Sequence, residues 1–290
     1  MRSEAVLLVN PTSGKGHGLR VAREAADRLR GAGVSVRMVQ GRDADEALDV
    51  ARKVAGEEPE MLVAVGGDGL LHLAVQALAG TEVPLGLVPA GTGNDVARAL
   101  DVPVDTAEAT ATLLAGRVRT IDLGRVGAEY FAGVLYAGFD SAVNERTNTM
   151  RWPRGRMRYN VAIALELRAF RPLRFLLELD GEERQLEAMF VSVGNTGQYG
   201  GGLRICPDAV PDDGLFHVTV IAPVPRRVVP LLMPKLYKGT HVDHPAVSTY
   251  TARRVGLASA GVLAYADGER VGPLPVHCEV VPNALRVITP

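Results

Sequence analysis

The first third of the chain alternates between short apolar runs and longer stretches whose apolar residues recur every three or four positions. The apolar runs are rich in Val and Leu, which is typical of buried strands, and they cover 5–10, 34–39, 61–66 and 84–89. The longer stretches have the period of amphipathic helices, and they lie near 18–31, 43–55, 70–79 and 94–100. This alternation predicts a mostly parallel sheet covered by helices, with ligands at the strand ends.

After about residue 123 the pattern changes to apolar runs separated by turn signals. These runs include YFAGVLYAG, RFLLELDG, MFVSVGN, LFHVTVIAP and VHCEVVP. Asp180-Gly181 and Asp213-Gly214 are typical of tight turns, and one long helical candidate covers about 157–170. We therefore expect an α/β protein with an N-terminal three-layer α/β domain, 1–123, and a C-terminal antiparallel β-sandwich domain, 124–282. A length of 290 residues fits two such domains.

Bulk composition limits the cellular compartment and the classes of binding partner that we expect. The net charge of −1 lacks the broad positive field that attracts a polyanion, so no nucleic acid partner is expected. No apolar run approaches the roughly 18 residues of a membrane-spanning helix, and the N-terminus has the pattern of a strand and a turn rather than a signal peptide. The two cysteines, Cys206 and Cys278, exclude a disulfide scaffold but leave a single bridge open. We expect a cytoplasmic protein.

Three strand ends carry clusters of glycine with Asn, Asp, Ser or Thr. Glycine lets backbone amides approach phosphate oxygens closely, and the positive end of a following helix adds to the attraction. The residues expected to hold a polyphosphate are Asn10, Pro11, Thr12, Ser13 and Gly14 in the first loop, Gly66, Gly67 and Gly69 in the second, and Gly91, Thr92 and Asn94 in the third. Each loop taken alone is equally compatible with a plain strand-to-helix turn.

Two common nucleotide motifs are absent from these loops. The first loop has Gly16 after Lys15 where a P-loop needs a hydroxyl residue, and Val9 stands where the P-loop glycine would lie. None of the loops has the glycine spacing and downstream acid of a dinucleotide site. Hydride transfer therefore gains no support from the sequence.

The ordered series NPTSGKG, GGDG and PAGTGNDVARAL resembles the catalytic domain of the diacylglycerol kinase family, which includes sphingosine and ceramide kinases. The segments GFDSAVNER, GNTGQYGGGLRICPDAVPDDGLF and ADGERVGPLPVHCEVVPNALRVITP extend the resemblance to the bacterial soluble lipid kinases over nearly the whole chain. The resemblance implies an N-terminal fold like that of NAD kinases and phosphofructokinases, to which the tail, about 283–290, returns. It also implies ATP as co-substrate, Mg²⁺, and a lipid hydroxyl as acceptor.

The resemblance assigns a separate role to each of three acids. Asp68 is expected to orient water and Mg²⁺ near the phosphates, although it could instead cap the helix that begins near Leu70. Glu269, in Asp267-Gly268-Glu269, is the expected general base, and partial burial would raise its basicity; residue pattern alone predicts a hairpin turn with solvated acids. Asp213 is the expected metal ligand, whereas its local sequence is that of a plain turn.

Further contacts follow from the same resemblance. The backbone carbonyls of Val210 and Leu215 complete the expected Mg²⁺ site with Asp213, since a hard cation prefers oxygen ligands. Gln40 ends the second strand, where the family has a nucleotide-contacting Thr. Apart from the resemblance, Lys15 is a secondary candidate for a phosphate contact, although a lysine in an exposed loop is more often solvated. Asn94 and Asp95 are also candidates to cap the following helix.

The chain departs from the family pattern directly after the GGDG loop. The family usually has Thr there, followed within two residues by Asn-Glu, whereas this chain has Leu70, His72 and Leu73. Backbone amides would then hold most of the nucleotide. His72 is a candidate replacement contact, but a lone histidine on a helix is more often structural or solvated.

The segment 151–174 forms a local basic patch with aromatic residues among its arginines. Its members are Arg151, Trp152, Arg154, Arg156, Arg158, Tyr159, Arg168, Phe170, Arg171 and Arg174. Arginines with an interfacial Trp suit an anionic membrane surface, so we expect a peripheral protein that meets a lipid substrate there; a helix packed on the sandwich with solvated arginines is the alternative. Two other functions stay open, an NAD kinase and a non-catalytic lipid-binding protein with a degenerate nucleotide site. The oligomeric state also stays open, a homodimer included.

Overall fold

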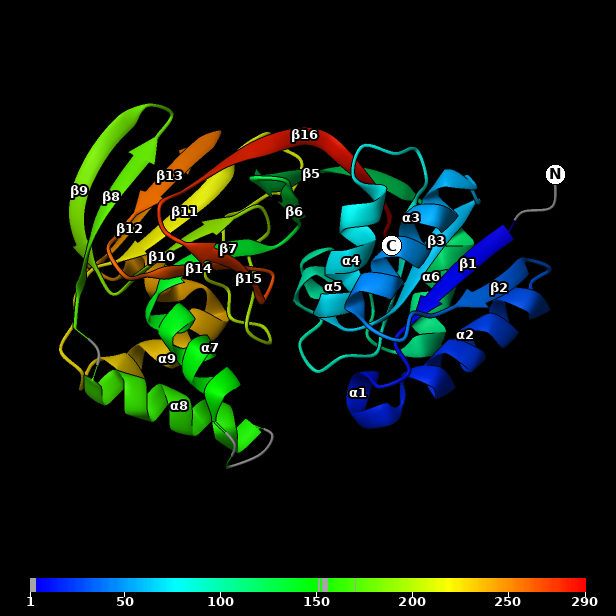
Figure 1. Cartoon of the computed structure of the whole chain (residues 1–290), viewed down its shortest axis with the longest axis horizontal. Coiled ribbons are helices and arrows are strands. Elements are labelled where there is room, and N and C mark those ends of the chain that lie inside the picture. The colour runs from blue at the N-terminus through cyan, green and yellow to red at the C-terminus, as the bar shows by residue number, and fades with distance from the viewer. Residues whose placement is uncertain (1–3, 151, 153–155, 170) are drawn as a thin grey trace.

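The protein has an α/β half and a β-sandwich half, which lie side by side and share a long strand (Figure 1). The computed structural model describes residues 4–150, 152, 156–169 and 171–290; the side chains of residues 156, 159 and 160 are not described. Both the parallel α/β architecture and the antiparallel sandwich expected from the sequence are confirmed. The division of the chain at residue 123 stays a prediction.

The α/β half is built on four parallel strands in the order β2-β1-β3-β4. Their bounds are β1 Glu4–Val9, β2 Ser35–Val39, β3 Met61–Gly66 and β4 Leu85–Pro89. All residues of β3 and β4 are buried because helices cover both faces of this sheet. The apolar runs of the sequence therefore locate these strands to within one residue.

Six helices belong to this half. They are α1 Ser13–Gly16, α2 Gly18–Gly31, α3 Ala44–Gly56, α4 Asp68–Leu78, α5 Asp95–Ala99 and α6 Thr106–Ala115. One core lies between the sheet and α3, α4 and α5, and a second lies between the sheet and α2 and α6. The sequence analysis missed α6, although Asp105 caps it by accepting hydrogen bonds from Ala107 and Glu108.

The strand β16, Val276–Ile288, passes from the sandwich into the α/β sheet (Figure 1). Its last residues pair with β4 in parallel, with Val287 opposite Leu85. Along most of its length it pairs with β5, Val118–Val126, in an antiparallel ladder interrupted between Val281 and Leu285. Backbone hydrogen bonds of β16 on both sides of this interruption therefore join the two halves.

The sandwich encloses its core between the far end of this large sheet and a separate six-stranded antiparallel sheet. The large sheet contributes β6 Glu129–Phe131, β8 Leu173–Leu179, β9 Glu182–Ala188 and β13 Arg254–Ala258. The six-stranded sheet contains β7 Val134–Gly138, β10 Phe190–Gly194, β11 Phe216–Ile221, β12 Val247–Ala252, β14 Leu263–Ala266 and β15 Glu269–Pro273. The stacked rings of Phe131 and Phe216 bridge the two sheets.

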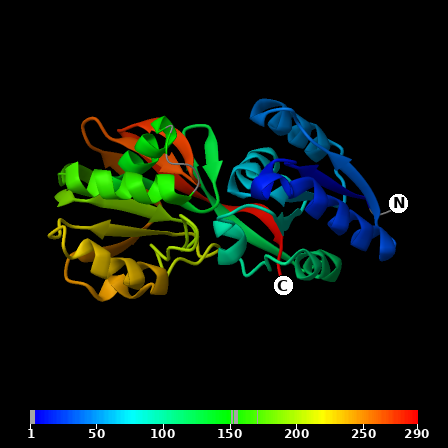
Figure 2. The ribbon, with the colours of Figure 1, turned by 90° about the horizontal axis from the view of Figure 1, so that it is seen from below.

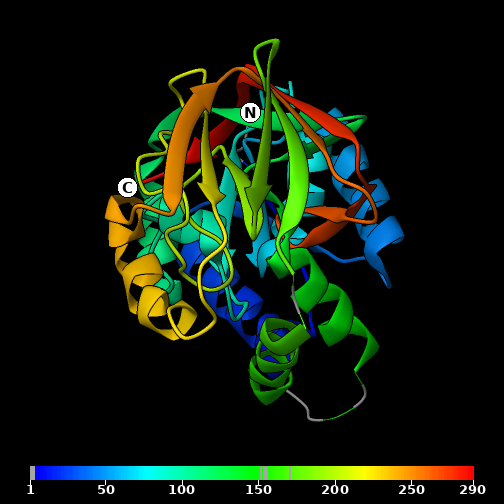
Figure 3. The ribbon, with the colours of Figure 1, turned by 90° about the vertical axis from the view of Figure 1, so that its left-hand side faces the viewer.

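Helices cover the outer face of the six-stranded sheet, and Figures 2 and 3 show them on one side of the sandwich. They are α7 Phe139–Thr149, α8 Arg156–Ala169 and α9 Val229–Lys238, followed by a 3₁₀ turn at Thr240–Asp243. The sequence predicted α8 but missed α7 and α9. α9 contains Pro230 and Pro234, and Pro230 lies in its first turn, where proline is tolerated.

Candidate functional site

Three glycine-rich loops meet at the carboxyl ends of β1, β3 and β4. The pairing register aligns Val9 with Val65, and Gly66 with Pro89, so the three strands stop at the same edge. The amide of Asn10 donates to Val65 O, and the amide of Ala90 donates to Gly66 O. The structure thus brings together loop segments that lie far apart in the sequence.

The backbones of these loops approach so closely that side chains would not fit between them. A Cβ atom on Gly91 would lie 2.5 Å from the Cα of Gly67, and a Cβ atom on Gly14 would lie 2.5 Å from Ala90 O. Gly14 also has a left-handed backbone, with φ of 58°. Glycine is required at these positions by close approach, which leaves backbone groups exposed at the edge.

Asp68 fastens the second loop to the third. Its Oδ2 accepts a hydrogen bond of 2.7 Å from the amide of Asn94, and its Oδ1 accepts one of 2.7 Å from the amide of Asp95. These amides open α5, so Asp68 caps that helix from across the site. The expectation that Asp68 caps the helix near Leu70 was wrong, since that helix, α4, begins at Asp68 itself with Gly67 at its N-cap.

Asn94 and Asn10 stabilise their own loops. The Asn94 side chain accepts from Gly91 N at 3.0 Å and donates to Gly91 O at 3.1 Å, and it makes no capping bond to α5. Asn10 Oδ1 accepts from the amide and the hydroxyl of Thr12. Both side chains therefore shape the loops, and the free groups of these loops are mostly backbone groups.

Glu269 begins β15 directly after a tight hairpin turn. Asp267 and Gly268 both have positive φ, 53° and 89°, as a type I′ hairpin turn requires. A Cβ atom on Gly69 would lie 3.3 Å from Glu269 Oε1, so the carboxylate faces the GGDG loop. Glu269 is exposed, so burial does not raise the basicity of this side chain.

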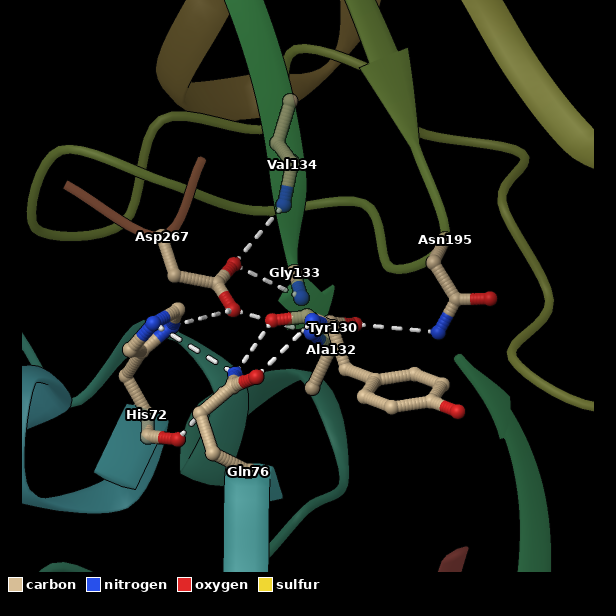
Figure 4. A network of polar contacts seen from close by, with 8 residues as sticks. All are labelled: His72, Gln76, Tyr130, Ala132, Gly133, Val134, Asn195 and Asp267. Carbon is tan, nitrogen blue, oxygen red and sulfur yellow. Dashed lines mark hydrogen bonds and ion pairs between the residues drawn. The ribbon is translucent and has the colours of Figure 1, made fainter. Parts of the chain in front are cut away.

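Asp267 is buried, in contrast to the solvated turn acid that the residue pattern predicts. Its side chain is 5% exposed, and its carboxylate accepts hydrogen bonds from the amides of Ala132, Gly133 and Val134 (Figure 4). These amides belong to the linker, residues 130–134, through which the chain passes from β6 to β7. Asp267 therefore ties the hairpin of Glu269 to the segment between β6 and β7.

The same network contains a side chain from α4. His72 is 8% exposed, and its Nδ1 lies 3.9 Å from Asp267 Oδ2. Gln76, one turn later, accepts from the amide of Tyr130 at 2.9 Å and donates to its carbonyl at 2.6 Å. The expectation that His72 contacts a nucleotide stays untested, but its buried ring faces the linker and the hairpin (Figure 4).

Asp95 makes a further connection between the halves, which the sequence analysis did not find. Its carboxylate accepts hydrogen bonds from the amides of Gly201 and Gly202, in the loop after β10. Burial, together with the nearby charge of Asp68, raises the pKa of Asp95, although the hydrogen bonds oppose the shift. The signal in the sequence was the cluster Gly200-Gly201-Gly202, which offers amides without side chains.

Comparison with known proteins gives this arrangement a family. Residues 4–126 match the family model described as the diacylglycerol kinase catalytic domain, and residues 133–289 match the one described as the YegS C-terminal NAD kinase beta sandwich-like domain. A Mycobacterium tuberculosis protein named diacylglycerol kinase is 43% identical over 290 residues, which cover 98% of this chain and 94% of that protein. The chain belongs to the diacylglycerol kinase family.

More distant members of the diacylglycerol kinase family also match along their whole length. A diacylglycerol kinase of Staphylococcus carnosus is 28% identical over 296 residues, with coverage of 100% of this chain and 96% of that protein. The crystal structure of a diacylglycerol kinase from Bacillus anthracis superposes with a TM-score of 0.76 at 18% identity and covers 99% of this chain and 97% of that chain. This likeness shows a shared fold.

The departures from the usual diacylglycerol kinase pattern after the GGDG loop have a structural explanation. Leu70 is 5% exposed and packs in the core of the α/β half, and a Cβ atom on Gly66 would lie 2.7 Å from its Cδ2. Leu73 packs partly buried against the same core. These two side chains therefore stabilise α4 by apolar burial rather than through polar contacts.

The expected metal-binding segment is held at a different place from the three loops. Asp213 Oδ1 accepts from Leu215 N at 2.9 Å, and its Oδ2 lies 3.2 Å from His217 Nε2. The segment is fixed by a bidentate ion pair between Arg119 and Asp212, with both bonds at 2.8 Å. Val210 and Asp213 are exposed, and the hydrogen bonds of the Asp213 side chain go to Leu215 and His217 rather than to the loops.

A buried acid, Asp122, links this segment to the rest of the network. Its carboxylate accepts from Gly214 N and Asn283 N at 2.7 and 2.8 Å. Asn195 then donates to Asp122 O and to Ala132 O, which is part of the linker. A chain of hydrogen bonds thus connects the Asp213 segment to the hairpin of Glu269.

The remaining predicted residues lie at the surface. Gln40 is exposed at the end of β2, and Lys15 and Thr92 are exposed in their loops. Arg151, Arg154 and Phe170 of the basic patch lie outside the described residues.

Cys206 and Cys278 are buried and free, so the single bridge that the sequence left open does not form. None of the described helices has the length and apolar character that crossing a membrane requires.

Proposed function

We propose that this member of the diacylglycerol kinase family is an ATP- and Mg²⁺-dependent kinase that phosphorylates a hydroxyl of diacylglycerol or a related lipid. The observation that carries the proposal is the position of an exposed carboxylate, Glu269, against Gly69 at the edge where three glycine-lined loops meet. Relatives named diacylglycerol kinase that match along nearly the whole chain support the same reaction.

The loops supply what a polyphosphate needs. Gly14, Gly67 and Gly91 lie where a Cβ atom would contact neighbouring backbone, so glycine lets the three loops pack together. The backbone amides of the packed loops are the groups that would bind the phosphates. Asp68 keeps the second and third loops in register through the amides of Asn94 and Asp95. Positioned amides of this kind stabilise the negative charge of a phosphoryl group during transfer.

Glu269 would accept the proton of the lipid hydroxyl as the new phosphate ester forms. A general base has to lie within hydrogen-bond distance of that hydroxyl, and the position of Glu269 beside the GGDG loop allows an acceptor to sit between the carboxylate and the phosphates. The turn residues Asp267 and Gly268 fix the start of β15 and hence the backbone of Glu269.

The Asp213 segment has a donor set that fits Mg²⁺. One carboxylate and the backbone carbonyls of Val210 and Leu215 are hard oxygen ligands, and Mg²⁺ retains several waters. Among the described residues no cluster of three or more His, Cys, Asp or Glu side chains could hold a metal, so carbonyls and waters would make up most of the coordination. Mg²⁺ held by these groups would stabilise the Asp122 network, which connects this segment to the hairpin of Glu269.

The helices under the six-stranded sheet would contact an anionic membrane surface. Large apolar side chains project into solvent at Trp152, at Met157 and Leu165 on α8, and at Leu231 and Tyr237 on α9. Arg168, Lys235 and Lys238 in the last turns of these helices are also exposed. Apolar side chains beside basic ones match the interface of a bilayer that contains anionic lipid.

The test is transfer of radiolabelled phosphate from ATP to a panel of lipids in mixed micelles with Mg²⁺. Diacylglycerol, sphingosine, ceramide and phosphatidylglycerol are offered alongside NAD. Transfer to a lipid that Asp68→Ala and Glu269→Gln abolish, and that the exposed control Glu183→Gln leaves unchanged, would establish the proposal and identify the acceptor. Transfer to NAD would favour an NAD kinase, and lipid binding without any transfer would favour a non-catalytic protein.

A further inference from the structure

One face of α4 spans the distance from the phosphate loops to the linker. Gly69, His72 and Gln76 follow at intervals of three and four residues and therefore lie along one side of the helix. Gly69 faces Glu269, and Gln76 holds the backbone of the linker at its other end. His72 lies between these contacts and faces Asp267 (Figure 4).

Gln76 also lies against the ring of His72. Its Oε1 accepts from Tyr130 N and its Nε2 donates to Tyr130 O, so these two backbone bonds set the orientation of the amide. The same Nε2 lies 3.4 Å from His72 Nε2 and 3.5 Å from His72 O, so its second hydrogen has two acceptors within reach. The carboxylate of Asp267 on the Nδ1 side favours the tautomer with hydrogen on Nδ1, which leaves Nε2 as an acceptor.

The hydrogen on Nδ1 faces a carboxylate in a buried setting. Nδ1 has no hydrogen-bond partner within normal distance among the described residues, and the nearest acid oxygen, Asp267 Oδ2, is 3.9 Å away. Asp267 already accepts from three linker amides and is 5% exposed. A positive or donating group beside a buried carboxylate stabilises its charge.

We propose that His72 is a positioning residue for phosphoryl transfer, which holds Asp267, and with it the hairpin that carries Glu269, at a fixed distance from the GGDG loop. The inference rests on the proposed function. Asp267 is two residues before Glu269 in a two-residue turn, so a displacement of its carboxylate moves the base. The α4 helix carries both His72 and the loop glycine, so it sets the spacing between base and phosphates.

The charges around His72 support this role. Burial of the ring lowers its pKa, but the carboxylate of Asp267 and the charges of Glu269 and Glu129 outweigh that effect, and the net pKa of His72 is raised. Among the described residues, these three acids are the groups whose charges raise the pKa of His72. Each of them attracts the donor side of His72 and keeps α4 against the hairpin.

The experiment compares His72→Leu with His72→Asn in the lipid kinase assay. Leucine fills the site without a donor, whereas the Asn side chain amide can place a donor near the position of Nδ1. We expect His72→Leu to lower kcat by about 10- to 100-fold, because small displacements of a base are costly, with KM for ATP changed by no more than about twofold. His72→Asn should recover kcat to within about threefold of the wild type.

His241→Leu is the matched control. His241 is also buried, binds Ile205 O through Nε2 and has an Nδ1 without a hydrogen-bond partner among the described residues, but it lies in the sandwich half. The His241→Leu variant should have a lower free energy of unfolding and an unchanged kcat. A second readout, the ¹⁵N chemical shifts of the His72 ring, should report hydrogen on Nδ1 and a pKa that falls in Asp267→Asn.

Three outcomes separate the inference from the function on which it rests. An active wild type whose kcat is unchanged in His72→Leu, or equally reduced in His241→Leu, would overturn only the role of His72. A His72 ring that carries its hydrogen on Nε2 would overturn it as well. A wild type that transfers phosphate to no lipid, with the Glu269→Gln variant as inactive as the wild type, would refute the proposed function and this inference together.

Discussion

Replacing Gly91 by alanine tests whether the close approach of the second and third loops serves nucleotide binding. The new Cβ atom would lie 2.5 Å from the Cα of Gly67 and 2.8 Å from Asn94 Oδ1, whereas ordinary contact begins at 3.4 Å. Gly91 does not have a positive φ, so contact is the only obstacle. The backbone of Gly67 would have to move by roughly 0.9 Å, the difference between 3.4 and 2.5 Å.

We expect Gly91→Ala to lower the free energy of unfolding by about 1–3 kcal/mol, the usual cost of overpacking. Because the loops that we propose to hold the phosphates would move apart, KM for ATP should rise by about tenfold, which corresponds to about 1.4 kcal/mol of binding. The rate at saturating ATP should change less than KM. Denaturant unfolding and initial-rate kinetics over a range of ATP concentrations measure the two effects.

Gly56→Ala is the control for this substitution. Gly56 is exposed at the end of α3, and a Cβ atom there would meet nothing within 4 Å. This change should leave KM for ATP unaltered and raise the free energy of unfolding by about 0.5 kcal/mol. The reasoning would be refuted if Gly91→Ala kept the wild-type KM and stability, or if both variants lost ATP affinity equally.

Two further predictions concern the sandwich half. Burial raises the pKa of Asp140 to about 7, so the folded protein opposes ionisation of this carboxyl. The contribution of the neutral Asp140 to the free energy of unfolding is therefore fully present below the unfolded pKa near 4. This contribution is lost as the pH rises through about 7. The change in the free energy of unfolding caused by Asp140→Asn should therefore be more favourable at pH 8 than at pH 4, by up to about 4 kcal/mol. Urea unfolding at the two pH values measures this difference, and a change independent of pH would contradict the prediction. Leu231→Gln combined with Tyr237→Gln should weaken binding to phosphatidylglycerol vesicles by about tenfold or more, while Leu114→Gln, which alters an exposed leucine of α6, should not.

Part of this molecule follows from local sequence. The strands of the α/β sheet and α2, α3 and α4 appear within about two residues of their predicted bounds because buried strands and amphipathic helices leave a periodic record in the chain. The glycine clusters at three strand ends predicted loops that lie close together, because parallel strands end at the same edge of a sheet. The α/β class and the sandwich followed from the change of pattern after residue 123.

Other elements could not be found in this way. α7 is rich in Ser, Asn and Thr, which have low helix propensity, and α9 contains two prolines. Both helices form because their few apolar residues, such as Val143 and Met233, pack on the outer face of the six-stranded sheet. Most of the stability of a helix in a protein comes from such packing, which local propensity does not record.

The candidate site shows the same division. Sequence and resemblance identified Asp68, Glu269 and the glycines as candidates, whose roles stay predictions, but they did not predict that Asp68 caps a helix 27 residues further along the chain. Nor did they predict that His72 faces Asp267 or that Asp267 is buried while Glu269 is exposed. Residue types and their local spacing decide which side chains can do the chemistry. Contacts between residues far apart in the chain depend on how the two halves pack together, and only the tertiary structure decides those.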